Sequence, residues 1–343
     1  MNIAVTQPDP KRRETEARAR FKSVRLRPPF LRDAQRTLET VRAAGRATRG
    51  RPQPIVPIIG PSQSGKTTII DDFCERIAKK EGVREGVHPV LSVTLTANST
   101  MKSLGFDIVN ALGDDSLPHE AIAGLARQNR PSRRAYTVTE ILHVAVTAMK
   151  NASVELLVLD EMHHLRNLDS ERTKWSVTES VKWLSIQGVC PIVCLGIRRL
   201  TDVISASANA QLAARCVEPI WLEPLDFEIE DERQTFMGFI DGIDEEMVNH
   251  GIFERRADFL QRGWPERFYD FSLGIIGRAS RLIEAAMVVA IRAGHARIEL
   301  EDLSLATRTW GMRLGFTDFN PWAAPDAKLR DLALIRELAK RAS

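Results

Sequence analysis

Residues 60–67 constrain this chain more than any other segment. They read Gly-Pro-Ser-Gln-Ser-Gly-Lys-Thr and fit the pattern G-x-x-x-x-G-K-[ST] without a mismatch. A short apolar run precedes them at 55–59, and a helical pattern follows at 68–80. Glycines let the backbone turn so that successive N–H groups converge on phosphate oxygens, and the helix adds its positive N-terminal end. The segment therefore predicts a strand, a phosphate-binding loop and a helix.

The residues of this loop have distinct expected roles. Lys66 is placed to reach the β- and γ-phosphates of a nucleotide, and the Thr67 hydroxyl is placed to bind Mg²⁺. We expect Lys66 to contribute to catalysis as well as to binding. The predicted nucleotide contacts are Gly60, Pro61, Ser62, Gln63, Ser64, Gly65, Lys66, Thr67 and Thr68.

Two adjacent carboxylates end a second apolar run about ninety residues later. Residues 154–159 are nearly all apolar, as in a parallel strand that is buried on both faces, and Asp160 and Glu161 follow. Ligands gather at the carboxyl ends of parallel strands. We therefore expect Asp160 to hold Mg²⁺, directly or through water, and Glu161 to orient and deprotonate an attacking water. The alternative is a surface pair that caps the next helix. With the loop, the pair predicts hydrolysis of a nucleoside triphosphate, and the absence of an N-K-x-D element favours ATP.

Histidine and cysteine patterns give little support for a further metal site. His163 and His164 are adjacent and cannot share one face of a helix or strand, so a role near Glu161 or simple packing is favoured over metal binding. The cysteines lack zinc spacing and fit reduced, buried thiols of a cytoplasmic protein. They are Cys74, Cys190, Cys194 and Cys216.

Apolar patterning predicts an α/β domain with a parallel sheet, followed by a helical domain. Expected strands alternate with helices and lie at 55–59, 89–95, 154–161 and 191–195. From residue 227 onward helical patterns prevail, at 264–273, 278–293 and 303–309. Residues 45–54, rich in Gly, Arg and Pro, are expected to form a linker. The predicted domains are a basic N-terminal arm (1–50), a nucleotide-binding α/β domain (51–226), a helical lid (227–312) and a C-terminal tail with an amphipathic helix (313–343).

The charge of the chain is unevenly distributed. Residues 1–51 hold 14 Lys and Arg against 5 Asp and Glu, a balance of +9, whereas the whole chain carries +3. This asymmetry suggests contact with nucleic acid or an acidic partner, and a solvated leader is the alternative. No apolar stretch approaches the ~20 residues that span a bilayer, and no secretory signal is visible, so we expect no membrane association.

Two groups of basic residues have candidate roles outside the loop. Arg215 follows the fourth expected strand and its helix, where it could reach the γ-phosphate of a neighbouring subunit. Arg278 and Arg281 begin a helix of the second domain, and one of them could close over the nucleotide. Without further support, a surface salt bridge is the simpler role for each arginine.

At this point the residues resemble the AAA+ ATPases, and more narrowly the TniB/TnsC group of transposition regulators, relatives of MuB and IstB. The resemblance covers roughly residues 20–310. It rests on the basic N-terminal segment, the loop at 60–67, the sequence Leu-Val-Leu-Asp-Glu-Met-His-His-Leu at 157–165, Val-Cys-Leu-Gly at 193–196, Gln-Leu-Ala-Ala-Arg at 211–215 and the helix that begins near Gly277 and Arg278.

The resemblance implies an ATP-dependent homo-oligomer, a ring or a helical filament, that assembles on double-stranded DNA. Such proteins mark target DNA, recruit a DDE transposase and often respond to a TniQ-like targeting factor. Lys66 and Thr67 carry over to phosphate and Mg²⁺ binding, Asp160 and Glu161 to the Walker B roles, and Arg215 to the trans-acting finger. A polar sensor residue is expected at the end of the fourth strand, and residues 195–197 supply none. The expected hydrolysis is therefore slow and regulatory.

Contact with DNA should be to the phosphate backbone rather than to base edges, because a targeting platform does not need to read sequence. A solvated loop is the alternative for most of the candidates. They are Lys102, Arg127, Arg130, Arg133 and Arg134. The aromatic residues of the C-terminal stretch either dock a partner or pack against the lid; they are Trp310, Phe316, Phe319 and Trp322.

Three other classes share part of this pattern. A replication initiator or helicase loader has the same ATPase core but predicts a dedicated DNA-reading module, which is not visible after residue 312. A DExH helicase fits Asp-Glu-Met-His at 160–163, but it needs a second RecA-like domain. A small-molecule kinase would not need Glu161 as a water activator or a finger at Arg215.

Overall fold

The computed structural model describes residues 10–82, 86–96, 99–113, 137–162 and 171–324. The chain forms two compact units. The sheet unit contains the described residues of Arg32–Ser62 and Lys66–Leu222. The helical unit contains the described residues up to Leu31, the segment Gln63–Gly65, and the described residues from Glu223 onward. Among the described helices, none combines the length and the apolar character that crossing a membrane requires.

The sheet unit is built on a five-stranded parallel sheet with the strand order β2-β3-β4-β1-β5. The strands are β1 (Ile55–Ile59), β2 (Val90–Thr94), β3 (Leu156–Asp160), β4 (Ile192–Gly196) and β5 (Ile220–Trp221). Every residue of β1 and β4 is buried. Continuous apolar runs of this kind are what a parallel strand needs when both faces of its sheet are covered. The α/β fold and the four predicted strands are confirmed; the two-residue β5 was not predicted.

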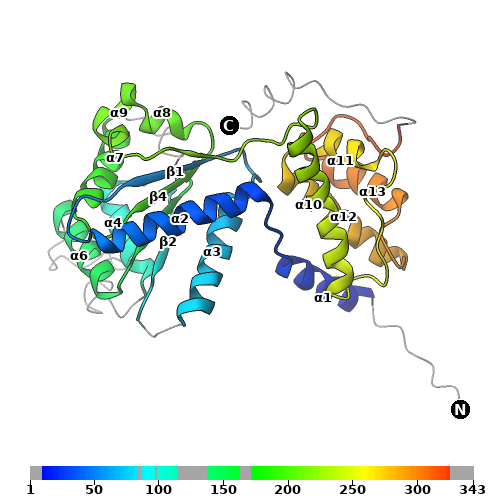
Figure 1. Cartoon of the computed structure of the whole chain (residues 1–343), viewed down its shortest axis with the longest axis horizontal. Coiled ribbons are helices and arrows are strands. Elements are labelled where there is room, and N and C mark those ends of the chain that lie inside the picture. Colours follow the sequence, from blue (N-terminus) through cyan, green and yellow to red (C-terminus); the bar gives the residue numbers. More distant parts are fainter. Residues whose placement is uncertain (1–9, 83–85, 97–98, 114–136, 163–170, 325–343) are drawn as a thin grey trace, which may run out of the picture. The chain divides into compact units, whose positions relative to one another are not determined.

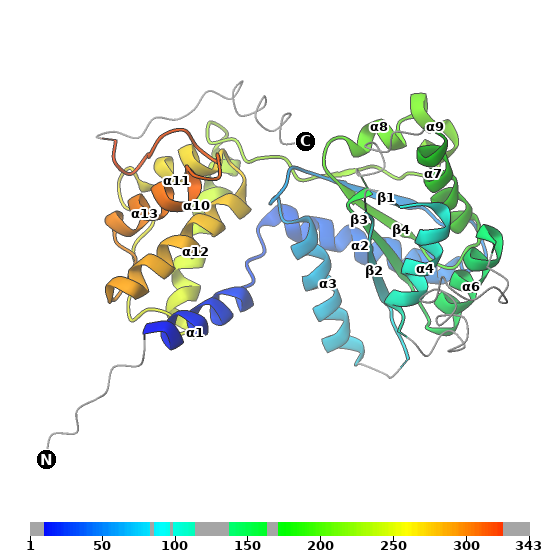
Figure 2. The same cartoon turned by 180° about the vertical axis from the view of Figure 1, so that it is seen from behind.

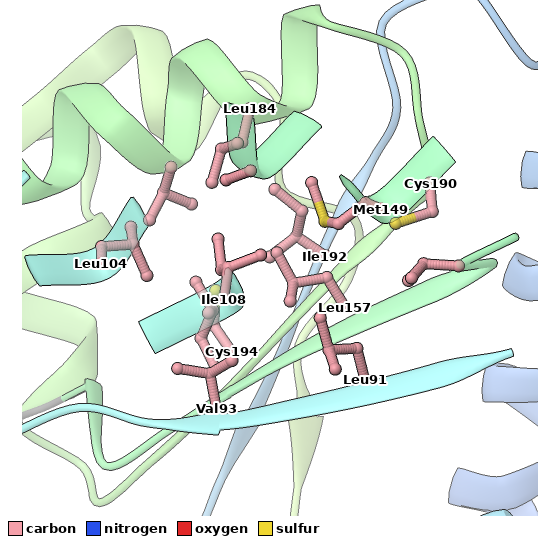
Figure 3. Close-up of a cluster of buried hydrophobic side chains, with 14 of the residues drawn as sticks. Leu91, Val93, Leu104, Ile108, Met149, Leu157, Leu184, Cys190, Ile192 and Cys194 are labelled. Carbon is pink, nitrogen blue, oxygen red and sulfur yellow. The ribbon is translucent and has the colours of Figure 1, made fainter. Parts of the chain in front are cut away.

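Helices cover both faces of the sheet, with α2 (Pro29–Ala47) over one face and α4 (Met101–Ala111) over the other (Figures 1 and 2). The remaining helices of this unit are α3 (Lys66–Glu81), α6 (Val138–Asn151), α7 (Glu171–Ile186), α8 (Leu200–Ile204) and α9 (Ala206–Ala213). Figure 3 shows the buried cluster between the sheet and α4, α6 and α7. Alternate strand residues such as Val93, Leu157 and Ile192 point into it from the sheet. Two free cysteines, Cys190 and Cys194, lie in this core, whereas Cys74 and Cys216 are half-buried.

The segment 45–54 is packed rather than a linker, so that prediction was wrong. Helix α2 continues through Gly45 to Ala47, and a Cβ added at Gly45 would collide with the ring of Pro191. Gln53 is buried, its N–H donates to the carbonyl of Ser185 at 2.9 Å, and the Ser185 hydroxyl donates to the Gln53 carbonyl at 2.6 Å. The Gly, Arg and Pro content therefore reflects close packing against the sheet and not chain freedom.

The helical unit contains α1 (Pro10–Ser23), α10 (Glu230–Asn249), α11 (Trp264–Ser272), α12 (Ile276–Ala293) and α13 (Leu300–Ala306), followed by a π-helical turn, η3 (Thr307–Gly311). Helix α1 packs on α12: Ala17 and Phe21 are buried, and Glu14 pairs with Arg292 at 2.8 Å. Helices were predicted for α11, α12 and α13, and these are confirmed. The predicted arm at 1–50 therefore contains two packed helices, α1 in the helical unit and most of α2 in the sheet unit.

The aromatic residues that follow η3 pack within the helical unit. Trp322 is buried against Trp264 and Phe268, with ring centroids 5.5 and 4.8 Å away. Trp310 lies 5.0 Å from Phe316. Of the two possibilities for this stretch, packing against the lid is therefore the one observed. The predicted amphipathic helix at 326–342 lies outside the described residues.

Candidate nucleotide site

The loop at 60–67 connects the buried strand β1 to helix α3, as predicted. Its first N–H, from Gly60, donates to the carbonyl of Gly196 at the end of β4, at 3.2 Å. Gln63 and Gly65 have positive φ angles of 69° and 98°. These left-handed residues curl the backbone inward, which is the geometry of an anion-binding nest at the start of a helix. Gly65 fits this position because glycine adopts positive φ without steric cost.

Lys66 is the first residue of α3, and its side chain is held inside the loop. Only 8% of Lys66 is exposed, and Nζ donates to the carbonyls of Gly60 at 2.7 Å and Pro61 at 2.8 Å. Burial lowers the pKa of Lys66 to about 8, although Glu161 and Asp160 partly oppose this shift. A buried ammonium that is satisfied by two neutral carbonyls gains strongly when an anion arrives, so Lys66 is suited to bind phosphate.

Thr67 and Asp160 are 93 residues apart in sequence and meet at the carboxyl edge of the sheet. Thr67 Oγ1 lies 3.5 Å from Asp160 Oδ2, at the outer limit of a hydrogen bond. The other carboxylate oxygen, Oδ1, accepts the backbone N–H of Glu161 at 2.7 Å. Hydroxyl and carboxylate oxygens are the ligands that Mg²⁺ prefers, and Mg²⁺ usually takes only one or two protein carboxylates and fills its other positions with water and phosphate. The pair therefore fits a magnesium ion bound together with a nucleotide.

Glu161 directly follows β3 and has a left-handed backbone, with φ of 58°. A non-glycine residue rarely adopts this conformation, and such residues are common at functional sites. The sequence indicated the carboxylate but gave no sign of this backbone conformation. Its effect on the pKa of Lys66 shows that the Glu161 carboxylate lies within electrostatic range of the loop.

The loop also holds a buried hydroxyl that fits an incoming anion. Ser64 is 5% exposed, and its Oγ has no hydrogen-bond partner among the described residues. An unpaired buried hydroxyl costs free energy unless a ligand satisfies it. Of the other predicted contacts, Pro61 is buried, whereas Ser62 and Thr68 are exposed at the two ends of the loop.

Arg215 lies at the amino ends of the strands, whereas the phosphate loop of the same chain lies at their carboxyl ends. Its carbonyl accepts the N–H of Ile55, the first residue of β1, at 2.9 Å. The loop begins after Ile59, and four residue steps of strand span roughly 13 Å. One Arg215 nitrogen donates to the carbonyl of Gln211 at 2.8 Å, and Nε is buried without a partner in the described part of the chain. In this arrangement, the finger role predicted for Arg215 concerns the nucleotide of another subunit.

The two lid arginines differ in their surroundings within the helical unit. Arg278 is half-buried in the first turn of α12, and its guanidinium lies 5.7 Å from the centre of the Phe316 ring. Burial lowers the pKa of Arg278. Arg281 is one turn further along, its side chain is 59% exposed, and it pairs with Glu284 at 2.7 Å. The sequence gave no basis for choosing between them; the structure separates a half-buried cation from a surface ion pair.

Some predicted residues lie away from this site or outside the described residues. Lys102 is on α4, with Nζ 6.0 Å from the centre of the Phe106 ring. The other candidate DNA contacts and the histidine pair lie outside the described residues: Arg127, Arg130, Arg133, Arg134, His163 and His164. Arg198, two residues after β4, is exposed, with its guanidinium 5.8 Å from the centre of the Trp221 ring.

The family model of the bacterial TniB protein matches residues 28–224, more than half of the chain. The chain belongs to the TniB family. The matched segment contains the phosphate loop, the Asp160–Glu161 pair and Arg215, and it includes nearly the whole sheet unit.

Two solved structures show the fold of this TniB-family chain. The ORC2 protein of Aeropyrum pernix, in its ADPNP-ADP complexes, is 14% identical, with a TM-score of 0.56 over 95% of this chain and 83% of that one. The Cdc6p protein of Pyrobaculum aerophilum is also 14% identical, with a TM-score of 0.53 over 85% and 70%. No curated protein matches the chain. The fold is that of the AAA+ ATPases, and by family, fold and motif the chain is an AAA+ ATPase.

Proposed function

We propose that this TniB-family ATPase binds ATP with Mg²⁺, assembles as a homo-oligomer on double-stranded target DNA, and recruits or activates a DDE transposase. Hydrolysis of ATP then drives disassembly. The observation that carries the proposal is the approach of Thr67 to Asp160 beside the buried Lys66, in a chain of the TniB family. A phosphate-binding lysine beside a pair of magnesium ligands is what a nucleotide-dependent switch requires.

Each residue of the site has a defined part in this proposal. The backbone N–H groups of the loop and the Lys66 ammonium bind phosphate oxygens, and Ser64 supplies a further donor. Thr67 and Asp160 hold Mg²⁺, which neutralises charge on the phosphates when it is bound. Glu161 orients a water and accepts its proton as the water attacks. Arg215 of another subunit and a lid arginine contribute positive charge at the transferred phosphoryl group.

Slow hydrolysis suits a switch better than a motor. Strand β4 ends at Gly196, and a Cβ there would lie 2.9 Å from the Cβ of Leu200, so this position has little room for a polar side chain. Ile197, the next residue, is buried. A site without a polar group at this strand end orients the attacking water less well. We expect the ATP-bound oligomer to persist long enough to recruit a transposase or respond to a TniQ-like factor.

DNA binding is proposed to act mainly through phosphate contacts. Its affinity should then fall steeply with salt, because each neutralised phosphate releases counterions. Lys102 is the described candidate, and Lys102→Ala should weaken binding to unrelated duplexes to the same extent. A sequence-dependent loss would argue for base readout instead.

Negative-stain imaging tests the proposed assembly. The full chain is mixed with duplex DNA and a slowly hydrolysed ATP analogue, and parallel samples omit the nucleotide or the DNA. Rings or filaments that depend on both components support the proposal. A protein that stays monomeric and does not bind DNA under any of these conditions would refute it.

Two substitutions separate nucleotide binding from hydrolysis in the same assay. Lys66→Ala removes the buried ammonium and should abolish ATP-dependent assembly. Glu161→Gln keeps the side-chain volume but cannot accept a proton, so it should lower ATP turnover by 10²-fold or more and trap the assembled form. A disassembled Glu161→Gln protein would remove Glu161 from the catalytic role.

The alternative is a replication initiator or helicase loader, which the fold of the two solved neighbours also accommodates. A transposase of DDE chemistry and a replicative helicase, each offered to the DNA-bound assembly, distinguish the two functions. ATP-dependent co-assembly with the transposase alone favours the transposition role. Retention of the helicase alone favours the alternative.

A further inference from the structure

Helices α2 and α3 form the walls of a groove on the surface of the sheet unit, and all of its lining belongs to that unit. The groove has a volume of about 520 Å³. Two ion pairs join its walls. Glu39 of α2 pairs with Arg76 of α3 at 2.7 Å, and Arg42 of α2 pairs with Glu81 at the end of α3 at 2.7 Å. These contacts fix the spacing of the two helices, which Figure 1 shows beside each other.

The groove carries an excess of positive charge. Its lining contains two carboxylates, those of Glu39 and Glu81, and five basic side chains. The basic residues are Arg42, Arg46, Arg76, Lys79 and Lys80. A third carboxylate, that of Glu155, pairs with Arg42 and lies 3.5 Å from Arg46. Five positive charges therefore face three negative ones, which leaves a surplus of two.

The surplus lies at the exposed rim of the groove. Arg42 is buried and is neutralised by Glu81 and Glu155, and its hydrogen bonds lower the pKa of Glu81. The Arg46 side chain is 53% exposed. Lys79 and Lys80 are exposed, and neither forms an ion pair with a residue that the structure describes. The cations that remain available to a ligand are therefore Arg46, Lys79 and Lys80.

The basic surface extends along α2 beyond the groove. Arg49, in the turn after α2, is exposed and donates to the carbonyl of Val154 at 3.1 Å, next to Glu155. From Arg42 to Arg49 a helical path advances roughly 10 Å. Successive phosphates of one DNA strand are about 3.4 Å apart along the duplex axis. The basic strip is therefore long enough to follow several phosphates of one strand.

The surroundings favour a phosphate backbone over other anions. A compact phosphate group is typically bound at a helix N-terminus, whereas Arg46 lies in the last turn of α2 and Lys79 and Lys80 in the last turn of α3. An acidic protein segment usually needs apolar anchors. Among the described residues that line the groove, the apolar ones are the small Ala43 and the buried Ile77. Flexible cations around a polar groove fit nucleic acid, whose interfaces are polar and strongly basic on the protein side.

We infer that the groove between α2 and α3 is a second DNA-contact surface, which binds the phosphate backbone of duplex DNA through Arg46, Lys79 and Lys80. The inference rests on the DNA binding in the proposed function. It adds a surface to the candidate Lys102, because α4 covers the other face of the sheet. Lys79 lies roughly 20 Å along α3 from Lys66, so the groove is separate from the nucleotide site.

Salt-dependent DNA binding of a charge-neutral double variant, Lys79→Gln with Lys80→Gln, tests this inference. Fluorescence anisotropy of the full chain is measured with two unrelated duplexes and a slowly hydrolysed ATP analogue, over a range of salt concentrations. At low salt the affinity of the double variant should fall roughly tenfold for both duplexes. The slope of log affinity against log salt should decrease by about two, one for each lost phosphate contact.

Matched variants separate a local contact from a general effect of charge. Lys150 is also exposed in the last turn of its helix, α6, so Lys150→Gln makes the same change of charge elsewhere on the sheet unit. It should leave the salt slope unchanged. Lys79→Arg with Lys80→Arg keeps both charges and should bind DNA within about twofold of wild type. Thermal unfolding and binding of a fluorescent ATP analogue check that the sheet unit of each variant is intact.

Two results would overturn the inference: a folded double variant with wild-type affinity and slope, or a loss in Lys150→Gln as large as that in Lys79→Gln or Lys80→Gln alone. Normal DNA binding by the double variant together with lost self-association would assign the groove to an acidic segment of another copy. In each of these cases wild type still binds DNA, and the proposed function stands without this surface. Wild type that never binds DNA refutes both.

Discussion

At the residue scale, the Lys66 ammonium is already held inside the phosphate loop when no anion is bound. The ammonium is buried and donates hydrogen bonds to two neutral backbone carbonyls, with no phosphate bound. Burial without a full counter-charge destabilises the charged form, which is why the pKa of Lys66 falls from 10.5 to about 8. Between these two values the unfolded chain holds the proton and the folded chain does not. The contribution of Lys66 to folding stability therefore rises with pH from about 8 to 10.5 in the free protein.

Nucleotide binding should have the opposite dependence on pH. Phosphate oxygens favour the ammonium form, so bound nucleotide raises the pKa of Lys66, and binding above pH 8 requires uptake of a proton. We expect nucleotide affinity to be constant below about pH 7 and to fall as pH rises through 8. Titration calorimetry in two buffers of different ionisation enthalpy measures the proton uptake directly.

Lys66→Arg is the control for this prediction, because a guanidinium stays charged throughout the range. Its residual affinity should not show the fall above pH 8. Equal pH profiles for Lys66→Arg and wild type would show that another group titrates.

Sequence reasoning located the residues whose position follows from a parallel sheet, and missed those placed by contacts between distant segments. The meeting of Thr67 with Asp160 followed from two strands whose carboxyl ends share one edge. The left-handed backbone of Glu161 has no sequence signal, because glutamate carries no preference for positive φ. Phe316 was assigned to an aromatic stretch, but its contact with Arg278 depends on the π-helical turn and could not be predicted from spacing.

At the element scale, the glycine of α2 shows that packing can override helix propensity. Alanine is favoured over glycine in a helix interior by up to about 1 kcal/mol. Gly45→Ala should nevertheless destabilise the sheet unit by roughly 1–3 kcal/mol, since the new Cβ would overlap Pro191 and lie 2.9 Å from Gln53 Oε1. Denaturant unfolding followed by circular dichroism measures the change.

Gly238 in α10 provides a matched comparison. It is exposed within the helix, and an added Cβ meets no atom within 4 Å. Gly238→Ala should therefore stabilise the helical unit by about 0.5–1 kcal/mol. If both substitutions stabilised the protein, the close packing of α2 on Pro191 would be contradicted.

Elements were missed where the apolar pattern is weak. Helix α1 is charged around its circumference, yet Ala17 and Phe21 bury against α12 while Glu14 pairs with Arg292. Helix α10 begins with Glu230, Asp231 and Glu232, which suit the positive end of a helix dipole but obscure an apolar period. Strand β5 has two residues and pairs with β1 at only two positions, too few for a repeating pattern.

At the scale of the whole molecule, the site in one chain is proposed to be incomplete. Lys66 lies at the carboxyl ends of the strands and Arg215 at their amino ends. A complete site would therefore take Lys66 from one subunit and Arg215 from another. Lys66→Ala and Arg215→Ala proteins should each hydrolyse ATP at least tenfold more slowly than wild type. Mixed together, they should recover part of the activity, because some interfaces combine an intact Lys66 with an intact Arg215.

The recovery should depend on total protein concentration and on DNA if assembly occurs there. A mixture of Lys66→Ala with Lys66→Arg is the control, since neither partner supplies an intact lysine. Failure of the first mixture to exceed the control, with both proteins folded, would place Arg215 outside the shared site.

The path of the chain also determines the effect of removing its N-terminal residues. Helix α1 belongs to the helical unit and most of α2 to the sheet unit, although both precede the phosphate loop. Leu38 of α2 is completely buried, as is much of the surface of α12 on which α1 lies. A protease cut between α1 and α2 would leave α1 held only by its own contacts. Deleting the first fifty residues would expose the hydrophobic cores of both units at once. The first observed effect should be insoluble protein rather than a loss of DNA binding.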